Sequence, residues 1–327
     1  RMHVGTQRFT TSDEHLDFLA RQGVNNMAIN DITFTQERGW DAEELAGKRE
    51  KCKSFGIDMQ MVALPLHQLN ADGGSTPNYM LGSSEKGDRE IDLVCQMVRA
   101  TADAGIPAIK YFLCEMENQR TEALPLGRGG VKYSTWDISK ADSETPRYDN
   151  PLTAEENWAR ITHFLERVIP VAEENKVRMA CHPCDPWLPS GYKGVDRVLG
   201  GADGFKQFID IHPSPYHGLN LCLGCMAESV KDPLNEVPGI IRYFGERKKL
   251  HLIHFRNIVG GQNNFQEVYP DEGVMNMHTL MQALKDVGYP HMVVPDHAPG
   301  HSAPGHFEQA FAFQFGFIKA MLQAVGL

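Results

Sequence analysis

The sequence lacks the features of several large classes of protein. No run approaches the ~20 apolar residues that a helix needs to cross a bilayer, and no charged-then-apolar secretion signal is found at its start. Seven cysteines in 327 residues are too few for a disulfide framework, and their odd number leaves at least one thiol free. The net charge of -10 lacks the basic surplus of a nucleic-acid surface. We expect a cytoplasmic protein with neither a membrane nor a nucleic acid as its partner.

Two further absences restrict the fold. No GxGxxG motif follows the first apolar run, which argues against a dinucleotide-binding domain. No sequence repeat of 20–50 residues indicates a solenoid. What the chain does contain is an ordinary globular composition, 42% hydrophobic and 23% charged, with enough residues for a large core.

Short apolar runs alternate with helical patterns along the whole chain. The expected strands cover residues 2–5, 24–29, 57–64, 106–113, 177–182, 219–222, 250–254 and 293–296. The expected helices cover residues 11–22, 41–55, 88–104, 153–175, 201–211, 233–248, 273–287 and 307–325. Such alternation predicts parallel strands with helical crossovers. Eight units in a chain of this length predict one α/β domain over residues 1–327, a (β/α)8 TIM barrel.

Two segments between these elements are expected to be loops. Residues 70–87 are rich in Gly, Ser and Pro, and residues 114–150 form a long polar stretch after the fourth strand. A loop as long as the second one inside a compact domain usually serves as a lid or a binding loop.

The last four expected strands each end on a potential metal ligand. These residues are His182, Cys222, His254 and Asp296. In a (β/α)8 barrel the carboxyl ends of all strands open on one face, so the four side chains should converge there. Each alone would be an ordinary rim or core residue. Together, two imidazoles, a thiolate and a carboxylate suit a divalent transition metal, whose identity the sequence leaves open.

The cysteines allow a second interpretation of this region. Cys181 and Cys184 form one CxxC pair and Cys222 and Cys225 another, as in a structural zinc site with four thiolates. Strand alternation weakens this alternative, because adjacent Cys181 and His182 point to opposite faces.

Acid–base and anion-binding groups surround the expected metal site. His297 follows Asp296 directly and is a candidate to move a proton, and His301 and His306 flank the same Gly/Pro-rich loop. Arg256 shares a side of its strand with His254, and a guanidinium there would bind a substrate carboxylate. Arg120 and Arg128, the latter beside several glycines, are candidates for an anion clamp. These groups suit proton abstraction next to a carboxylate.

Several blocks of the sequence resemble the mannonate dehydratase family. They are His182-Pro183-Cys184-Asp185-Pro186, Leu221-Cys222-Leu223-Gly224, His254-Phe255-Arg256-Asn257, Pro295-Asp296-His297, Arg120-Thr121, Gly127-Arg128-Gly129-Gly130 and Phe265-Gln266-Glu267. The resemblance implies a TIM barrel of the xylose-isomerase-like group. It also implies Mn²⁺ or Fe²⁺ chemistry that converts D-mannonate to 2-keto-3-deoxy-D-gluconate.

The resemblance also assigns roles to particular residues. It places the metal ligands on His182, Cys222, His254 and Asp296 and an acid–base histidine on His297. Asn257 joins Arg256 in a block expected to contact the substrate. The expected cofactor is a divalent metal, with Mn²⁺ first and Fe²⁺, Co²⁺ or Zn²⁺ as alternatives.

The sequence departs from the family pattern at two positions. Val294 stands where many members have Arg, and Phe311 falls where the spacing from Asp296 places the family's catalytic tyrosine. A phenyl ring cannot move a proton, so His301 or His306 is the expected substitute.

The sequence therefore leads to one main hypothesis and two alternatives. The main hypothesis is a metal-dependent hydro-lyase that acts on a small sugar acid, D-mannonate or a related aldonate. The first alternative is a metal-dependent sugar isomerase or epimerase on the same barrel. The second is a non-catalytic barrel with a structural zinc. A homo-oligomer is left open.

Overall fold

Eight parallel strands form the centre of the protein. The structure is a computed structural model that describes residues 1–327. The order of the strands around the sheet is β1, β11, β8, β7, β6, β4, β3, β2. A parallel bridge between Thr6 and Met27 joins the two edge strands and closes the ring. The eight strands are β1 (His3–Val4), β2 (Asn26–Ile29), β3 (Asp58–Ala63), β4 (Ala108–Phe112), β6 (Arg178–His182), β7 (His217–Cys222), β8 (Leu250–His254) and β11 (Met292–Val294). The predicted TIM barrel is confirmed.

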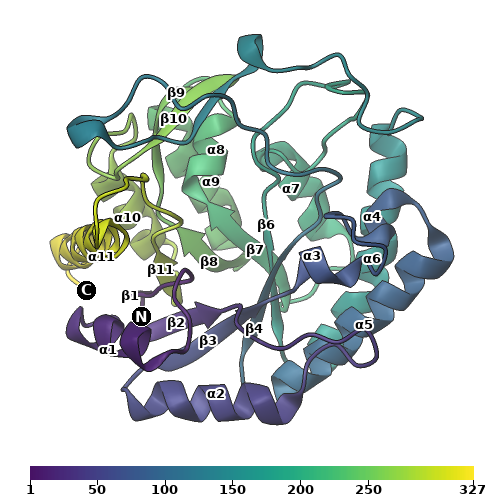
Figure 1. The fold of residues 1–327 in the computed structure, drawn as a ribbon, viewed down its shortest axis with the longest axis horizontal. Coiled ribbons are helices and arrows are strands. Elements are labelled where there is room, and N and C mark those ends of the chain that lie inside the picture. The colour runs from purple at the N-terminus through teal and green to yellow at the C-terminus, as the bar shows by residue number, and fades with distance from the viewer.

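Helices surround the barrel on its outside, and the two termini lie near each other (Figure 1). The longer helices are α1 (Asp13–Arg21), α2 (Ala42–Ser54), α5 (Ser84–Asp103), α6 (Ala154–Glu174), α7 (Ala202–Asp210), α9 (Pro233–Glu246), α10 (Met277–Asp286) and α11 (His306–Ala324). Each agrees with an expected helix to within a few residues. None is long and apolar enough to span a membrane.

Local sequence signals set where these helices begin. The side chains of Ser12, Asp41, Thr153, Asp232 and Asn276 each accept a hydrogen bond from a backbone N–H of the first helical turn. These bonds satisfy donors that a helix start otherwise leaves without partners. Local hydrogen bonds therefore fix the N-terminal ends of these helices, independently of how the helices pack.

The core has two parts, as the fold requires. A cluster of 81 buried residues fills the space between the strands and the helices. A separate cluster of seven residues fills the barrel interior: Ala28, Met61, Ala108, Ala180, Leu252, Met292 and Val294. Val294, one of the two departures from the family pattern, is thus a packing residue inside the barrel. The alanines on β4 and β6 leave room above them for larger polar side chains.

The loops hold more regular structure than their composition indicated. A second, antiparallel sheet of β5 (Thr135–Asp137), β10 (Asn264–Val268) and β9 (Asn257–Gly261) lies over the barrel, and it was not predicted. Short helices also appear: α3 (Leu66–Leu69), α4 (Asn78–Leu81), α8 (Leu223–Glu228), η1 (Arg128–Gly130) and η2 (Ile138–Lys140). The expectation that residues 70–87 and 114–150 form loops alone was wrong in these places, because pairing with distant segments decides short elements.

Candidate active site

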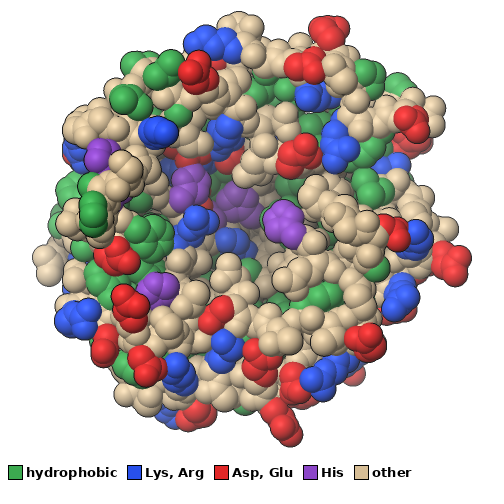
Figure 2. Space-filling model, in the orientation of Figure 1, with side chains coloured by type: hydrophobic (Ala, Val, Ile, Leu, Met, Phe, Trp, Pro, Cys, Tyr) green, Lys and Arg blue, Asp and Glu red, His purple; other side chains and the backbone are tan.

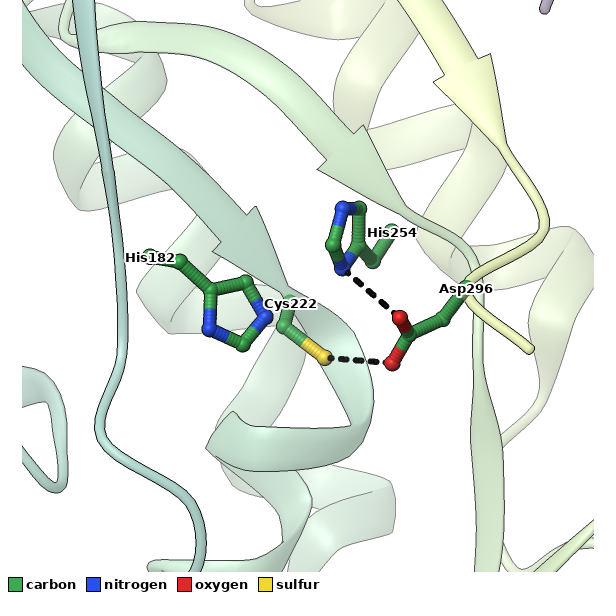
Figure 3. A group of neighbouring side chains, drawn as sticks. All are labelled: His182, Cys222, His254 and Asp296. Atoms are coloured by element: carbon green, nitrogen blue, oxygen red, sulfur yellow. Dashed lines mark hydrogen bonds and ion pairs between the residues drawn. The ribbon is translucent and has the colours of Figure 1, made fainter. Parts of the chain in front are cut away.

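Four side chains at the carboxyl ends of neighbouring strands point toward one another (Figure 3). His182, Cys222 and His254 are the last residues of β6, β7 and β8, and Asp296 lies two residues beyond β11. One ligand atom from each lies within 4.8 Å of the others. The structure therefore brings together the four residues that the sequence picked as metal ligands.

Hydrogen bonds outside the cluster orient its two imidazoles. Nδ1 of His182 lies 2.7 Å from the carbonyl oxygen of Pro183, so it carries the proton and leaves Nε2 free for a ligand. In His254 the roles are reversed, because Nε2 lies 2.9 Å from Oε1 of Gln7. Its buried Nδ1 has no hydrogen-bond partner and lies 3.3 Å from a carboxylate oxygen of Asp296. Histidines that bind metals are held in this way by a bond to the other ring nitrogen.

The surroundings of the other two members of the cluster favour their anionic forms. Burial opposes ionisation of Cys222, but a hydrogen bond from Cys225 and the charge of Arg256 hold the pKa of this thiol well below its ordinary value. Burial also opposes ionisation of Asp296, yet His297 and His254 hold its pKa well below the usual range. Two buried anions beside an unpartnered imidazole nitrogen fit a divalent metal ion, which would balance their charge.

A network of buried ion pairs lies next to this cluster. Arg256 contacts Glu267, Glu228 at 2.8 Å, Asp185 at 3.5 Å and Asp296 at 3.3 Å. Arg120 binds both carboxylate oxygens of Asp185 at 2.7 Å and also contacts Glu267. Asp185, Cys225 and Glu228 form a second group with ligand-like atoms close together, but the guanidinium of Arg256 already occupies its centre.

The network changes the role that can be assigned to two predicted substrate-binding residues. The guanidinium groups of Arg256 and Arg120 are paired with carboxylates of the protein itself. Neither therefore brings an unpaired positive charge to the site. Their contacts indicate that they position neighbouring acids, which the sequence could not show because the partners lie on separate loops and strands that only the fold brings together.

His297 lies between the network and the cluster. Its Nδ1 is 2.8 Å from Glu267, and its Nε2 is 3.3 Å from Asp296. Burial lowers the pKa of His297, but Asp296 and then Glu267 outweigh burial and raise it to about 9. The side chain lines two cavities of about 210 and 250 Å³, the second of which also borders the four-residue cluster. His297 is thus the predicted proton carrier that the structure places next to the cluster.

The other predicted site residues lie elsewhere. The amide of Asn257 bonds Pro270, Met275 and Ile258, so it orders the loop after β10 and has no capacity left for a substrate. Arg128 pairs with Asp271 at 2.6 Å and lines a separate cavity. His301 accepts a bond from Ala303, and Nε2 of His306 lies 2.8 Å from the carbonyl of Pro299. Their rings are 5.4 Å apart. Neither contacts the cluster.

The structure corrects one further sequence interpretation and shows where Phe311 lies. The four cysteines of the CxxC pairs do not meet, because Cys184 forms a disulfide with Cys114 and Cys222 faces the histidines. A four-thiolate zinc site is therefore excluded. Phe311 is buried in an aromatic cluster with Phe9 and Phe315. Phe311 therefore packs in the core, and the correspondence with the family's tyrosine stays a prediction from the spacing.

Sequence reasoning missed two polar residues of the barrel interior. Gln7 donates to Asp296 and lies against His254, and Lys110 donates to Oε1 of Gln7. The signal for Lys110 was present, because a lysine in the middle of the apolar strand Ala108–Phe112 needs a polar partner for its buried ammonium group. Nothing in the local sequence marks Gln7.

Comparison with known proteins decides the family. The D-mannonate dehydratase (UxuA) family matches residues 143–310, which is just over half of the chain. The chain belongs to the D-mannonate dehydratase family. Among curated relatives, mannonate dehydratase of Streptococcus equi subsp. zooepidemicus is 24% identical over 91% of this chain and 88% of its own length. That of Thermotoga neapolitana is 26% identical over 79% of this chain and 78% of its own.

Solved structures agree with this D-mannonate dehydratase fold. The crystal structure of mannonate dehydratase from Streptococcus suis serotype 2 superposes with a TM-score of 0.82 and 21% identity, covering 100% of this chain and 95% of that one. A structure of L-ribulose 3-epimerase gives a TM-score of 0.64 and 13% identity, with 99% and 96% covered. At these identities the likeness is one of fold.

Proposed function

We propose that this protein is a hydro-lyase that dehydrates a sugar acid, D-mannonate or a related aldonate, to a 2-keto-3-deoxy acid. The observation that carries the proposal is the meeting of His182, Cys222, His254 and Asp296 beside His297, in a member of the D-mannonate dehydratase family. Curated relatives that align along most of this chain are named mannonate dehydratases, which supports the substrate class.

The four-residue cluster is the proposed metal site, with Mn²⁺ as the first candidate and Fe²⁺, Co²⁺ or Zn²⁺ as alternatives. Mixed nitrogen, sulfur and oxygen donors suit all four ions. A metal bound there would supply positive charge to stabilise the negative charge that develops on the substrate next to its carboxylate. The thiolate and the carboxylate of the cluster would neutralise the charge of the metal.

His297 is the proposed acid–base residue. Its Nδ1 lies 2.8 Å from Glu267 and its Nε2 lies 3.3 Å from Asp296, and the side chain lines the cavity in which a proton would be exchanged. In the reaction a proton leaves C2 of the substrate and the hydroxyl on C3 departs as water with a proton from the enzyme. The resulting enol rearranges to the 2-keto acid, so atoms and charge balance. His301 and His306 stay predicted carriers of the second proton.

The test is an assay of the Mn²⁺-loaded protein on D-mannonate that follows formation of the 2-keto-3-deoxy acid. We expect turnover that a chelator abolishes and that added Mn²⁺ restores. His297→Gln should lower kcat by at least about 100-fold, in the range for loss of a general acid or base. His278→Gln, at an exposed position of α10, is the matched control and should keep full activity.

The outcome that contradicts the proposal is equally definite. If the protein binds Mn²⁺ stoichiometrically but forms no keto acid from D-mannonate or a panel of other aldonates, it is not a sugar-acid dehydratase. Incorporation of solvent deuterium into a sugar without loss of water would instead assign the isomerase or epimerase chemistry.

A further inference from the structure

The cavity beside the candidate metal site is open to solvent and lined by charged groups. Figure 2 shows a hollow on this face of the molecule in which histidine, lysine and arginine side chains gather. The cavity has a volume of about 250 Å³ and is bordered by three of the four cluster residues, His182, His254 and Asp296. A sugar acid that reaches the cluster must enter here and bring its carboxylate with it.

Two cations border this cavity without forming an ion pair, Arg8 and Lys110. Lys132 is also unpaired but lines the neighbouring cavity and is exposed. Arg8 is exposed as well, whereas Lys110 is half-buried inside the barrel. Because charges interact more strongly where water is excluded, Lys110 is the cation best placed to attract a buried carboxylate.

The strand β4 directs Lys110 into the barrel. Ala108, two residues earlier, belongs to the inner cluster of the barrel, and side chains alternate along a strand, so Lys110 points to the same side. Lys110 is paired in register with Ala180 on β6, and His182 is the next residue of β6 on that side. The small side chains of Ala108 and Ala180 leave the space that the stem of Lys110 occupies.

The hydrogen bonds of Lys110 leave it able to bind an anion. Its ammonium group donates to Oε1 of Gln7, an uncharged acceptor, and an ammonium group has three N–H donors. Burial lowers the pKa of Lys110 to about 8, although Asp296 acts in the opposite direction. Gln7 also contacts His254 and Asp296, so a single side chain separates the ammonium group from two members of the cluster.

We propose that Lys110 binds the carboxylate of the substrate and so selects acids over neutral sugars at this site. The inference rests on the proposed function for the class of ligand, and it assigns to Lys110 the role that the sequence gave to Arg256 and Arg120. Those two guanidinium groups are paired with Asp185, Glu228 and Glu267, so they cannot supply this charge without breaking buried ion pairs.

The test compares two ligands that differ only at the first carbon. D-mannonate carries a carboxylate there and D-mannitol carries a hydroxymethyl group. Binding of each to the Mn²⁺-loaded protein is measured at pH 7 by calorimetry, with His297→Gln present in every protein compared so that D-mannonate is not consumed during the titration. The wild type should prefer D-mannonate, and Lys110→Met should weaken its binding on the order of 10- to 100-fold, as expected for loss of a hydrogen bond between charged groups. Binding of D-mannitol should stay unchanged.

Two variants and one metal titration keep the result interpretable. Lys110→Arg retains the charge and should retain most of the preference for the acid. Lys249→Met removes a half-buried lysine at the opposite end of the barrel, where it bonds Ser214 and His217, and should leave the preference intact. Titration of each variant with Mn²⁺ should give wild-type stoichiometry, which shows that the cluster is preserved.

The possible failures are distinguishable. If Lys110→Met binds D-mannonate as tightly as the wild type, Lys110 does not bind the carboxylate. The proposal is also overturned if the wild type does not discriminate between the two ligands, or if Lys110→Arg loses the preference as fully as Lys110→Met. Discrimination without turnover would overturn the proposed dehydration but leave the role of Lys110 supported.

Discussion

Asp296 and His297 are neighbours in the sequence, yet they serve different parts of the site. Asp296 turns toward His254 and Cys222, whereas His297 places one ring nitrogen against Glu267. The strand β11 has ended at Val294, so the chain is no longer bound to strict alternation here. Two consecutive residues thus bring a candidate metal ligand and a candidate proton carrier to one cavity.

Far from the site, buried His217 should couple stability to pH. It begins β7, and its Nε2 lies 2.8 Å from the carbonyl of Phe208. Burial lowers its pKa from an ordinary 6.5 to about 4. Below pH 6.5 the His217 side chain takes up a proton when the protein unfolds. The contribution of neutral His217 to stability is therefore complete above pH 6.5 and is lost as the pH falls toward 4.

Replacement of His217 should therefore flatten the pH dependence of unfolding. Between pH 7 and pH 5 the wild type should lose about 2 kcal/mol more than His217→Gln in urea unfolding experiments. His278→Gln, which removes an exposed histidine, should behave as the wild type. Identical losses in wild type and His217→Gln would show that this histidine is not held neutral by burial.

At the scale of elements, the helices owe their boundaries to local bonds and their positions to packing. Helix α6 begins with a capping box. The side chain of Thr153 accepts a hydrogen bond from the backbone N–H of Glu156, and the side chain of Glu156 accepts one from the backbone N–H of Thr153. Its apolar face, which includes Phe164 and Val168, is buried against the barrel and the neighbouring helix. The first feature is local in sequence, and the second needs the whole fold.

Loss of the cap should weaken the protein by a measurable amount. Thr153→Ala removes an acceptor for a donor of the first turn and should lower the free energy of unfolding by about 1 kcal/mol in urea titrations. Thr279→Ala, at an exposed position of α10 with no side-chain bond, is the control and should cause no loss. Equal effects of the two changes would mean that the capping bond contributes nothing.

At the scale of the whole molecule, the ion-pair network joins segments from four parts of the barrel rim. Arg120 follows β4, Asp185 follows β6, Glu228 lies in α8 after β7, and Arg256 follows β8 and meets Glu267 of β10. Burial raises the pKa of Glu228 well above its ordinary value, and the charge of Arg256 opposes that shift. Two guanidinium groups face the carboxylates of Asp185 and Glu267.

The network makes Arg256 a residue on which stability depends. Arg256→Met would leave several buried acids without their cation and should lower the free energy of unfolding by about 3–5 kcal/mol. Arg128→Met, which breaks an exposed pair with Asp271, should cost no more than about 1 kcal/mol. Urea unfolding of both variants tests this difference. A small loss for Arg256→Met would show that the acids become neutral without penalty.

Much of the site could be predicted because a parallel barrel turns sequence order into position. Once the strands are placed, their carboxyl ends share one face, so His182, Cys222 and His254 had to meet. The contacts of Arg256, Asn257 and Arg128 do not follow from this rule about strand ends. Each depends on which side chain from a distant loop lies beside it, and loop conformations do not follow from strand alternation.

The sequence by itself determined the alternation of strands and helices, the barrel, and the four residues that converge at its rim. Only the tertiary structure decided the rest: the pairing of Arg256 with Glu228 and Glu267, and the place of Lys110 beside Gln7. Periodicity and strand order are properties of neighbouring residues, which local physics can fix. Charge pairing in a buried site is settled by contacts between residues up to 147 positions apart, as for Arg120 and Glu267.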